Sequence, residues 1–217
     1  MANGILVPVV DFSGMAEDEF NDWYDLEHIP QRLGVAGFLA CERWIAADNP
    51  RISVATYVLD NADVLKSPAY NAVGNHAGGS DRLSVWSKRV TARMKTLMRF
   101  EGDQIMAGGG VAPKDAPALL LNAMSVAPEH EDEFNEWYNT EYLLGNMTVN
   151  GVYGARRYLN RGTGPRYLTV YEFAHTEVSR QPAWDRARAQ SVWRRRIERL
   201  WTHAPGSPGI YRRLAAR

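Results

Sequence analysis

The sequence contains a tandem repeat, and this feature constrains the fold more than any other. Residues 17–45 align without a gap with residues 131–159, at a displacement of 114 positions, and 11 of these 29 positions are identical. The densest part reads EFNDWYDLEH in the first copy and EFNEWYNTEY in the second. Copies of about 100 residues are longer than the 20–45 residues of solenoid repeats. The chain is therefore expected to form two similar domains.

The two copies differ by an insertion. SVWSKRV at 84–90 matches SVWRRRI at 191–197 at a displacement of 107 instead of 114, so the first copy has seven additional residues. They fall within 73–82 (VGNHAGGSDR), whose glycines predict a loop. Because the second copy lacks this loop, the loop is a candidate for a function that only one half performs.

Each copy has the pattern of a β-α-β-β-α-β unit. In the first copy, the apolar run 4–12 predicts a buried strand, and 15–33 predicts a helix whose acidic first turn favours the helix dipole. Alternating segments at 37–46 and 51–60 predict two paired strands, followed by helical segments and a last strand that ends near Phe100. The expected fold class is α+β, with two ferredoxin-like (βαββαβ) repeats.

A segment rich in Gly, Pro and Ala separates the two copies. It begins MAGGGVAPKD and precedes the apolar run ALLLNAMSV, which starts the second copy. Such a composition is typical of a domain boundary. We assign residues 1–105 to an N-terminal repeat, 106–117 to a linker and 118–217 to a C-terminal repeat.

Composition and charge exclude several classes of partner. The formal net charge is zero, so no overall field attracts nucleic acid or an acidic membrane surface. Fourteen arginines follow from Arg156 onward, and we expect them to pair with the acidic helix starts at 16–22 and 129–136. No signal peptide is recognised, and no apolar run reaches the roughly 18 residues of a membrane span. The single Cys41 excludes an internal disulfide and is expected in packing. We expect a cytoplasmic protein.

The segment EFNDWYDLEHIPQRLGVAGFLACERW resembles the dimeric α/β-barrel superfamily, specifically its EthD-like members. These show a Trp/Tyr-x-x-x-His-x-Pro helix, then Pro/Ala-Gly-Phe and an Arg-bearing strand. The resemblance implies two ferredoxin-like units packed sheet to sheet, here as an intrachain pseudo-dimer, with ligands between the sheet and helices of a unit. Further oligomerisation stays open. Members include monooxygenases, cyclases, isomerases, dehydratases and haem enzymes, so the fold alone does not assign a reaction.

Ferredoxin-like topology also occurs in RNA-recognition modules. The strand VATYVLD lacks the paired stacking aromatics of those modules, and the chain is neutral overall. We therefore expect a small-molecule partner rather than RNA.

Positions that differ between the copies are the candidates for chemistry. His28 is replaced by a tyrosine in the second copy, Arg32 by an asparagine, and His76 lies in the extra loop. Histidine exchanges protons near neutral pH, and arginine holds oxyanions by paired hydrogen bonds. We assign His28, His76, Tyr24 and Arg32 as catalytic residues, with Tyr24 and Arg32 polarising a carbonyl. The alternatives are a helix-end role for His28 and an exposed loop position for His76.

A second group is assigned to substrate binding because aromatic and polar side chains suit an apolar or aromatic ligand. Its members are Trp23, Glu27, Tyr57, Trp44, Asn75 and Trp86. The alternative for the aromatic members is core packing. No dinucleotide, phosphate-loop or serine-hydrolase motif is present, and no spacing predicts a metal site. Cofactors are expected to be none. The alternatives are a metal ion held by His28, His76 and Glu27, and, from the resemblance, haem on His28 or His76.

We expect one working pocket, in the N-terminal repeat, and a C-terminal repeat that is degenerate. The expected reaction is cofactor-independent acid–base chemistry on an apolar or aromatic carbonyl compound, by a lyase, isomerase or cyclase. One alternative is a cofactor-free monooxygenase acting on a phenol. The other is a non-catalytic binding or stress-response protein.

Overall fold

In the computed structural model the described residues are 4–74, 82–109, 116–191 and 193–214. They form two compact units. Unit 1 runs to Asp103 and also takes in residues 161–163 and Leu214. Unit 2 holds residues 104–160 and 164–213. Asn75 and His76 lie outside the described residues. None of the described helices has the length and apolar character of a membrane span.

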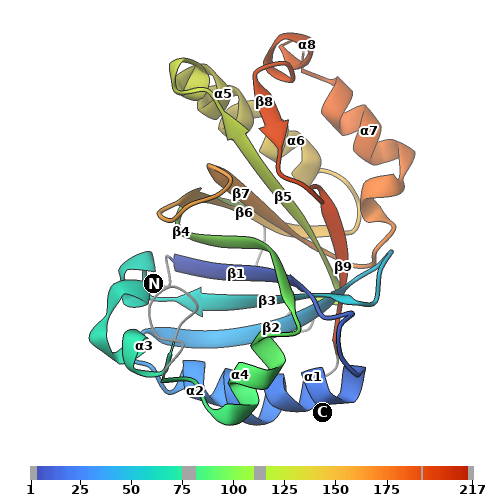
Figure 1. Cartoon of the computed structure of the whole chain (residues 1–217). Helices are drawn as coiled ribbons and strands as arrows, with labels where there is room; N and C mark the ends of the chain where they lie inside the picture. Colours follow the sequence, from blue (N-terminus) through green and yellow to red (C-terminus); the bar gives the residue numbers. More distant parts are fainter. Residues whose placement is uncertain (1–3, 75–81, 110–115, 192, 215–217) are drawn as a thin grey trace. The chain divides into compact units, whose positions relative to one another are not determined.

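Unit 1 is a four-stranded antiparallel sheet with helices along one face (Figure 1). Its strands are β1 (Gly4–Asp11), β2 (Phe38–Ala46), β3 (Ile52–Leu59) and the first part of β4 (Lys95–Gly109), whose residues from 104 onward belong to unit 2. Its α-helices are α1 (Glu17–Trp23), α2 (Ile29–Leu33), α3 (Pro68–Ala72) and α4 (Val85–Thr91). A 3₁₀ turn (Ala62–Lys66) precedes α3. The pairings β4–β1, β1–β3 and β3–β2 give the strand order of a ferredoxin-like unit.

Unit 2 repeats this order. Its strands are β5 (Ala118–Val126), β6 (Val152–Asn160), β7 (Tyr167–Phe173), β8 (Trp201–His203) and β9 (Gly209–Arg213). Its α-helices are α5 (Glu131–Trp137), α6 (Leu143–Met147), α7 (Pro182–Ala189) and α8 (Arg194–Ile197), with 3₁₀ turns at Pro128–His130 and Val178–Arg180. β5 pairs with β7, β8 and β9, and β6 pairs with β7. The fourth strand of the repeat is therefore split into β8 and β9.

The helix predicted over 15–33 is interrupted by a π-helical turn. This turn spans Tyr24–His28 in unit 1, and the equivalent turn spans Tyr138–Tyr142 in unit 2. Pro30 follows the turn in unit 1 but does not explain it, because unit 2 has leucine at the equivalent position. The turn is therefore a property of the shared motif. Such turns are rare in proteins as a whole, and those that occur are often found at functional sites.

The core of unit 1 lies between the sheet and the helices. Alternate residues of β1 point to one face, and Leu6, Val10 and the following Phe12 pack there against Phe20 and Trp23. The rings of Phe12 and Phe20 stack with their centroids 4.2 Å apart. This contact fixes the first turn of α1 on the sheet.

Gly37, which both copies share, ends the helical segment with φ +94°. A Cβ atom there would lie 2.5 Å from Cγ2 of Val64, so a side chain is excluded by strain and by space. The equivalent Gly151 has φ +92° and the same kind of neighbour, Val178. Both units therefore need glycine at the turn that leads from the helix to the next strand.

Strand β4 is longer than the sequence predicts. It continues to Gly109, so residues 106–109, which the sequence assigns to the linker, belong to a strand. Glycine and alanine lower strand propensity, but they do not prevent pairing where a neighbouring strand supplies the hydrogen bonds. Composition alone therefore predicts the start of the linker four residues too early.

Candidate functional site

A cavity of about 270 Å³ lies in unit 1, on the face of the sheet that the helices cover. Its apolar walls are Leu6, Pro8, Val10, Trp23 and Met94. Its polar lining consists of Tyr24, His28, Arg32, Tyr57, Tyr70, Thr96 and Arg99. Residues at every second position of β1 face the helices, which places the β1 side chains in the wall. Of the five predicted site residues on the repeated helix, Trp23, Tyr24, His28 and Arg32 line the cavity.

His28 lies inside an aromatic environment and is only 8% exposed. Its ring centroid lies 4.5 Å from that of Trp23 and 5.1 Å from that of Tyr24. The π-helical turn ends at His28, and α2 continues from there to Arg32. Both side chains therefore reach the same cavity.

Arg32 is buried, with 3% of its surface exposed. Its Nη2 donates to the backbone carbonyl of Gly74 at 2.6 Å, and its guanidinium carbon lies 5.1 Å from the ring centroid of Tyr70. Its Nη1 is buried and finds no hydrogen-bond partner in the described part of the chain. Buried guanidinium nitrogens are normally paired, so Arg32 has an unsatisfied donor in a side chain that lines the cavity.

Two buried tyrosines supply neutral hydroxyl groups. Burial raises the pKa of Tyr24 to about 12, against the opposing effect of the Arg43 guanidinium. Burial also raises the pKa of Tyr57 well above its ordinary value, and the neighbouring Tyr24 adds to this. Both hydroxyls therefore keep their protons at neutral pH. They can donate hydrogen bonds but cannot act as bases.

Strand β4 brings a cavity residue that the sequence reasoning missed. Arg99 lines the cavity, and its Nη2 donates to the hydroxyl of Tyr70 at 3.1 Å and to Oε2 of Glu101 at 3.2 Å. The signal available was the alternation of β4, which turns Arg99 to the face opposite its buried neighbour Phe100. That signal is weak without knowledge that β4 pairs with β1.

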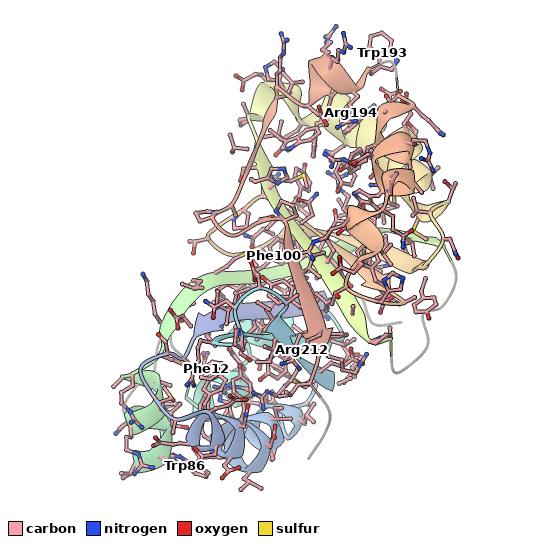
Figure 2. All side chains as sticks on the ribbon, turned by 90° about the vertical axis from the view of Figure 1, so that its right-hand side faces the viewer. Phe12, Trp86, Phe100, Trp193, Arg194 and Arg212 are labelled. Carbon is pink, nitrogen blue, oxygen red and sulfur yellow. The ribbon has the colours of Figure 1, made fainter. Side chains whose placement is uncertain are left out.

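Three predicted binding residues do not line this cavity. Glu27 faces α4, where its Oε1 accepts from Ser84 at 2.6 Å and from Ser87 at 2.5 Å. Trp44 donates from Nε1 to Oγ1 of Thr56, on the sheet face opposite the helices. Trp86 lies on α4 among the helices of unit 1 (Figure 2).

The reasons are geometric. Strand alternation sends Trp44 away from its neighbour Arg43, whose guanidinium donates to Asn21 of α1 at 2.6 Å and pairs with Asp25 at 3.0 Å. Glu27 lies on a different side of the helix from His28, because adjacent helical residues are about 100° apart. Arg43 forms an ion pair and ties α1 to the sheet. Asn75 and His76 stay predictions because they lie outside the described residues.

The equivalent space in unit 2 is filled by larger side chains. His28 corresponds to Tyr142, whose ring lies 4.8 Å from that of Trp137. Met94 corresponds to Trp201, which stacks on Trp137 with a centroid separation of 5.4 Å and an interplanar angle of 24°. The register supports this correspondence, because Met124 pairs with His203 in unit 2 as Val10 pairs with Thr96 in unit 1.

A haem does not fit this cavity. The His28 ring packs against two aromatic rings, and about 270 Å³ is less than the roughly 300–1,000 Å³ of pockets for drug-sized ligands, which a porphyrin exceeds. Among the residues that the structure describes, no group of three or more His, Cys, Asp or Glu side chains is placed to hold a metal ion.

The whole chain is similar to several solved structures. An anthrone oxidase-like protein matches with a TM-score of 0.62 and 11% identity, covering 99% of this chain and 94% of that one. A proposed monooxygenase from Lactobacillus acidophilus NCFM matches with a TM-score of 0.56 and 9% identity, covering 100% and 95%. A chlorite dismutase from Candidatus Nitrospira defluvii, in complex with imidazole, matches with a TM-score of 0.62 and 10% identity, covering 98% and 90%.

No protein-family model matches the sequence, and no curated protein sequence matches it either. The structural relatives are enzymes, and their names describe oxidoreductases rather than the expected lyase, isomerase or cyclase. The comparisons therefore favour the monooxygenase alternative over the main sequence expectation. The likeness shows the fold: the chain is an α+β protein of the dimeric α/β-barrel type.

Proposed function

We propose that this chain is a cofactor-independent oxygenase of the EthD-like group, which oxidises a small electron-rich hydroxyaromatic compound with O₂ in the cavity of unit 1. Three features support the proposal. The cavity is small and its walls are largely aromatic or apolar. It holds a proton-exchanging residue. The structural relatives include an anthrone oxidase-like protein and a proposed monooxygenase.

The observation that carries the proposal is the difference between the two units. Unit 1 keeps a cavity with His28 and Arg32 in its lining. Unit 2 has Tyr142 and Asn146 at the equivalent positions, and its Trp201 packs against the equivalent helix of unit 2. Packing alone would favour the filled form, because empty space in a core costs about 24 cal/mol per Å³. Retention of the space in one unit is expected where a ligand binds.

The proposed reaction needs no group beyond the substrate, O₂ and a base. Removal of a proton from an acidic C–H or O–H gives an electron-rich anion. This anion passes one electron to O₂, and the resulting radical and superoxide combine to form a C–O bond. Cleavage of the O–O bond with loss of water then gives a ketone or quinone. For a methylene carbon the sum is R₂CH₂ + O₂ → R₂C=O + H₂O, in which the carbon is oxidised and the oxygen is reduced.

His28 is the base in this scheme, by elimination among the lining residues. Arginine stays protonated at all working pH values, and the pKa of Tyr24 at about 12 excludes it at neutral pH. The neutral His28 imidazole has a ring nitrogen that can accept a proton. The Tyr24 hydroxyl can donate to the substrate oxygen, and the apolar walls limit access of water to the anion.

Oxygen uptake during turnover tests the proposal. Purified protein is mixed with anthrone or 1-naphthol in an oxygen-electrode cell, and the products are identified by mass spectrometry with ¹⁸O₂. We expect enzyme-dependent oxygen uptake and one ¹⁸O atom in the ketone or quinone. His28→Ala should lower kcat about 10²- to 10⁴-fold, the usual contribution of a general base.

His175→Gln is the matched control, because His175 is exposed in unit 2 and should leave turnover unchanged. Turnover that is equal with and without O₂ would overturn the proposal and favour the lyase, isomerase or cyclase. Binding without turnover across a panel of hydroxyarenes would favour the non-catalytic alternative.

A further inference from the structure

We infer that the cavity of unit 1 recognises an aromatic oxyanion, with Arg32 as the residue that binds the negatively charged oxygen. The inference rests on the proposed function, because it names the class of substrate that the same site takes. The ligand class is an aromatic ring system that carries a carboxylate or a phenolate.

The charge of the cavity lining is the first argument. Among the residues that the structure describes, the lining includes two guanidinium groups, Arg32 and Arg99, and no aspartate or glutamate. The remaining polar groups are tyrosine and threonine hydroxyls and the His28 imidazole, none of which is negative at neutral pH. A neutral aromatic ligand would leave this positive charge without compensation.

The second argument is the position of Arg32. Its guanidinium is almost fully buried, yet among the described residues its contacts are a neutral carbonyl, at Gly74, and the face of the Tyr70 ring. Removing a cation from water is strongly unfavourable unless an anion compensates it. Arg32 lines the cavity, and its Nη1 has no hydrogen-bond partner among the described residues, so the guanidinium can pair with an oxyanion bound there.

The third argument is that the nearby carboxylate already serves the other arginine. Glu101 pairs with Arg99 at 3.2 Å, and Arg99 in turn donates to the Tyr70 hydroxyl at 3.1 Å. Tyr70 therefore lies between the two guanidinium groups, with its ring toward Arg32 and its hydroxyl toward Arg99. In the described part of the cavity surroundings, Glu101 therefore compensates Arg99, and the positive charge of Arg32 remains for the ligand.

Unit 2 provides an internal comparison. The residue equivalent to Arg32 is Asn146, which is fully buried, and its Nδ2 donates to the Tyr171 hydroxyl at 3.2 Å. Where the space is filled, the position carries no charge and its amide nitrogen is paired within the core. At this one position, the cation occurs in the unit that keeps the cavity and an uncharged amide in the unit that does not.

Equilibrium binding of unreactive probes tests the inference without requiring turnover. The probes are 2-naphthoate, its neutral counterpart 2-naphthamide, and 2-naphthol, measured by calorimetry under anaerobic conditions between pH 6 and pH 10. We expect the best anionic probe to bind about 10- to 100-fold more tightly than 2-naphthamide. In Arg32→Gln this preference should disappear, so that the anionic and neutral probes bind about equally. Arg186→Gln, on the exposed face of α7, should retain the preference.

The probes also distinguish the two sources of charge. Tight binding of 2-naphthoate at all pH values assigns a carboxylate. Binding of 2-naphthol that strengthens as the pH rises through the pKa of the naphthol itself assigns a phenolate. Arg32→Gln should fold normally, because it removes a buried charge, and its melting temperature checks this. Equal binding of acid and amide, or an unchanged preference in a folded Arg32→Gln protein, would overturn the inference.

These results are independent of the oxygen assay. A protein that prefers 2-naphthoate through Arg32 but consumes no oxygen supports anion recognition and contradicts the proposed reaction. A protein that oxidises neutral substrates with full activity in Arg32→Gln supports the reaction and contradicts anion recognition.

Discussion

Exchange of one residue between the two copies should move stability in opposite directions in the two units. Arg43 and Arg157 are equivalent, buried and packed over aromatic rings, at 4.5 Å from the Tyr24 centroid and 4.3 Å from the Tyr138 centroid. Arg43 pairs with the carboxylate of Asp25, whereas Arg157 donates from Nη1 to the amide oxygen of Asn139 at 2.8 Å. Asp25→Asn therefore replaces an ion pair by a hydrogen bond from the guanidinium to an uncharged amide. Asn139→Asp makes the reverse replacement in unit 2.

The magnitude follows from the geometry of the Arg43 pair. Opposite charges 3.0 Å apart attract by roughly 5 kcal/mol at an effective dielectric constant of about 20. Much of this is offset by desolvation, since the Arg43 side chain is 5% exposed and that of Asp25 is 27% exposed. The amide in Asp25→Asn can still accept a hydrogen bond, so the net loss in free energy of unfolding should be about 1–2 kcal/mol. Asn139→Asp should gain about 1 kcal/mol or less, because Asn139 is half-buried and a new carboxylate there must also be desolvated.

Urea unfolding combined with hydrogen exchange and mass spectrometry separates the two units, because each peptide belongs to one of them. We expect faster exchange in the β2–β3 peptides of Asp25→Asn and slower exchange in the β6–β7 peptides of Asn139→Asp. The melting temperature should move by about 2–4 °C for each kcal/mol in a chain of this size. Asp60→Asn, at an exposed position after β3, is the control. If both exchanges changed stability by less than about 0.5 kcal/mol, the aromatic rings and not the carboxylate would hold the buried arginine.

Two further predictions concern the cavity and acid stability. Met94→Trp should fill the cavity, as Trp201 fills the equivalent space in unit 2. We expect 2-naphthoate to bind at least about tenfold more weakly, with the melting temperature retained. Unchanged binding would place the ligand elsewhere. Glu131 has a pKa held below its ordinary 4.5 by hydrogen bonds from Arg166, at 2.6 Å and 3.2 Å. A lowered folded pKa means that this stability is present above about pH 4.5 and is lost as the pH falls through the lowered value. Glu131→Gln should therefore destabilise by about 0.5–1 kcal/mol at pH 7 and by less at pH 3, measured by urea unfolding, and a difference independent of pH would contradict the ion-pair argument.

The fold could be predicted from the sequence because the repeat and the strand alternation depend on local pattern. Equivalent residues occupy equivalent positions in both units, and the shared Gly37 has the positive φ that its place after the helix requires. Two of the arginines expected to pair with the acidic start of the second helix do so, since Arg166 pairs with Glu131 and Arg196 with Glu133. Such pairs follow from a preference for acids in the first helical turn.

The site could be predicted only in part. Residues of one helix, such as His28 and Arg32, share a face, and the helical period indicates this from sequence alone. Arg99 and Tyr70 reach the cavity from other elements, and their approach depends on which strands pair. The assignment of Trp44 to the cavity was wrong, because an aromatic composition does not indicate which face of the sheet a given side chain points to. The π-helical turn could not be predicted, because the helical period of the sequence carries no signal for it.

A duplicated fold allows stability and function to reside in different units. In unit 2 the space beside the repeated helix is occupied by Trp201 and Tyr142, which add apolar contact and leave no buried charge at Asn146. In unit 1 the same space keeps a cavity and a buried guanidinium, both of which lower the stability of the ligand-free state. A ligand that fills the cavity and pairs with Arg32 would offset both costs in one step. Ligand binding should therefore stabilise unit 1 selectively, and hydrogen exchange with and without 2-naphthoate would reveal slower exchange in α2 and β4 while α6 and β8 stay unchanged.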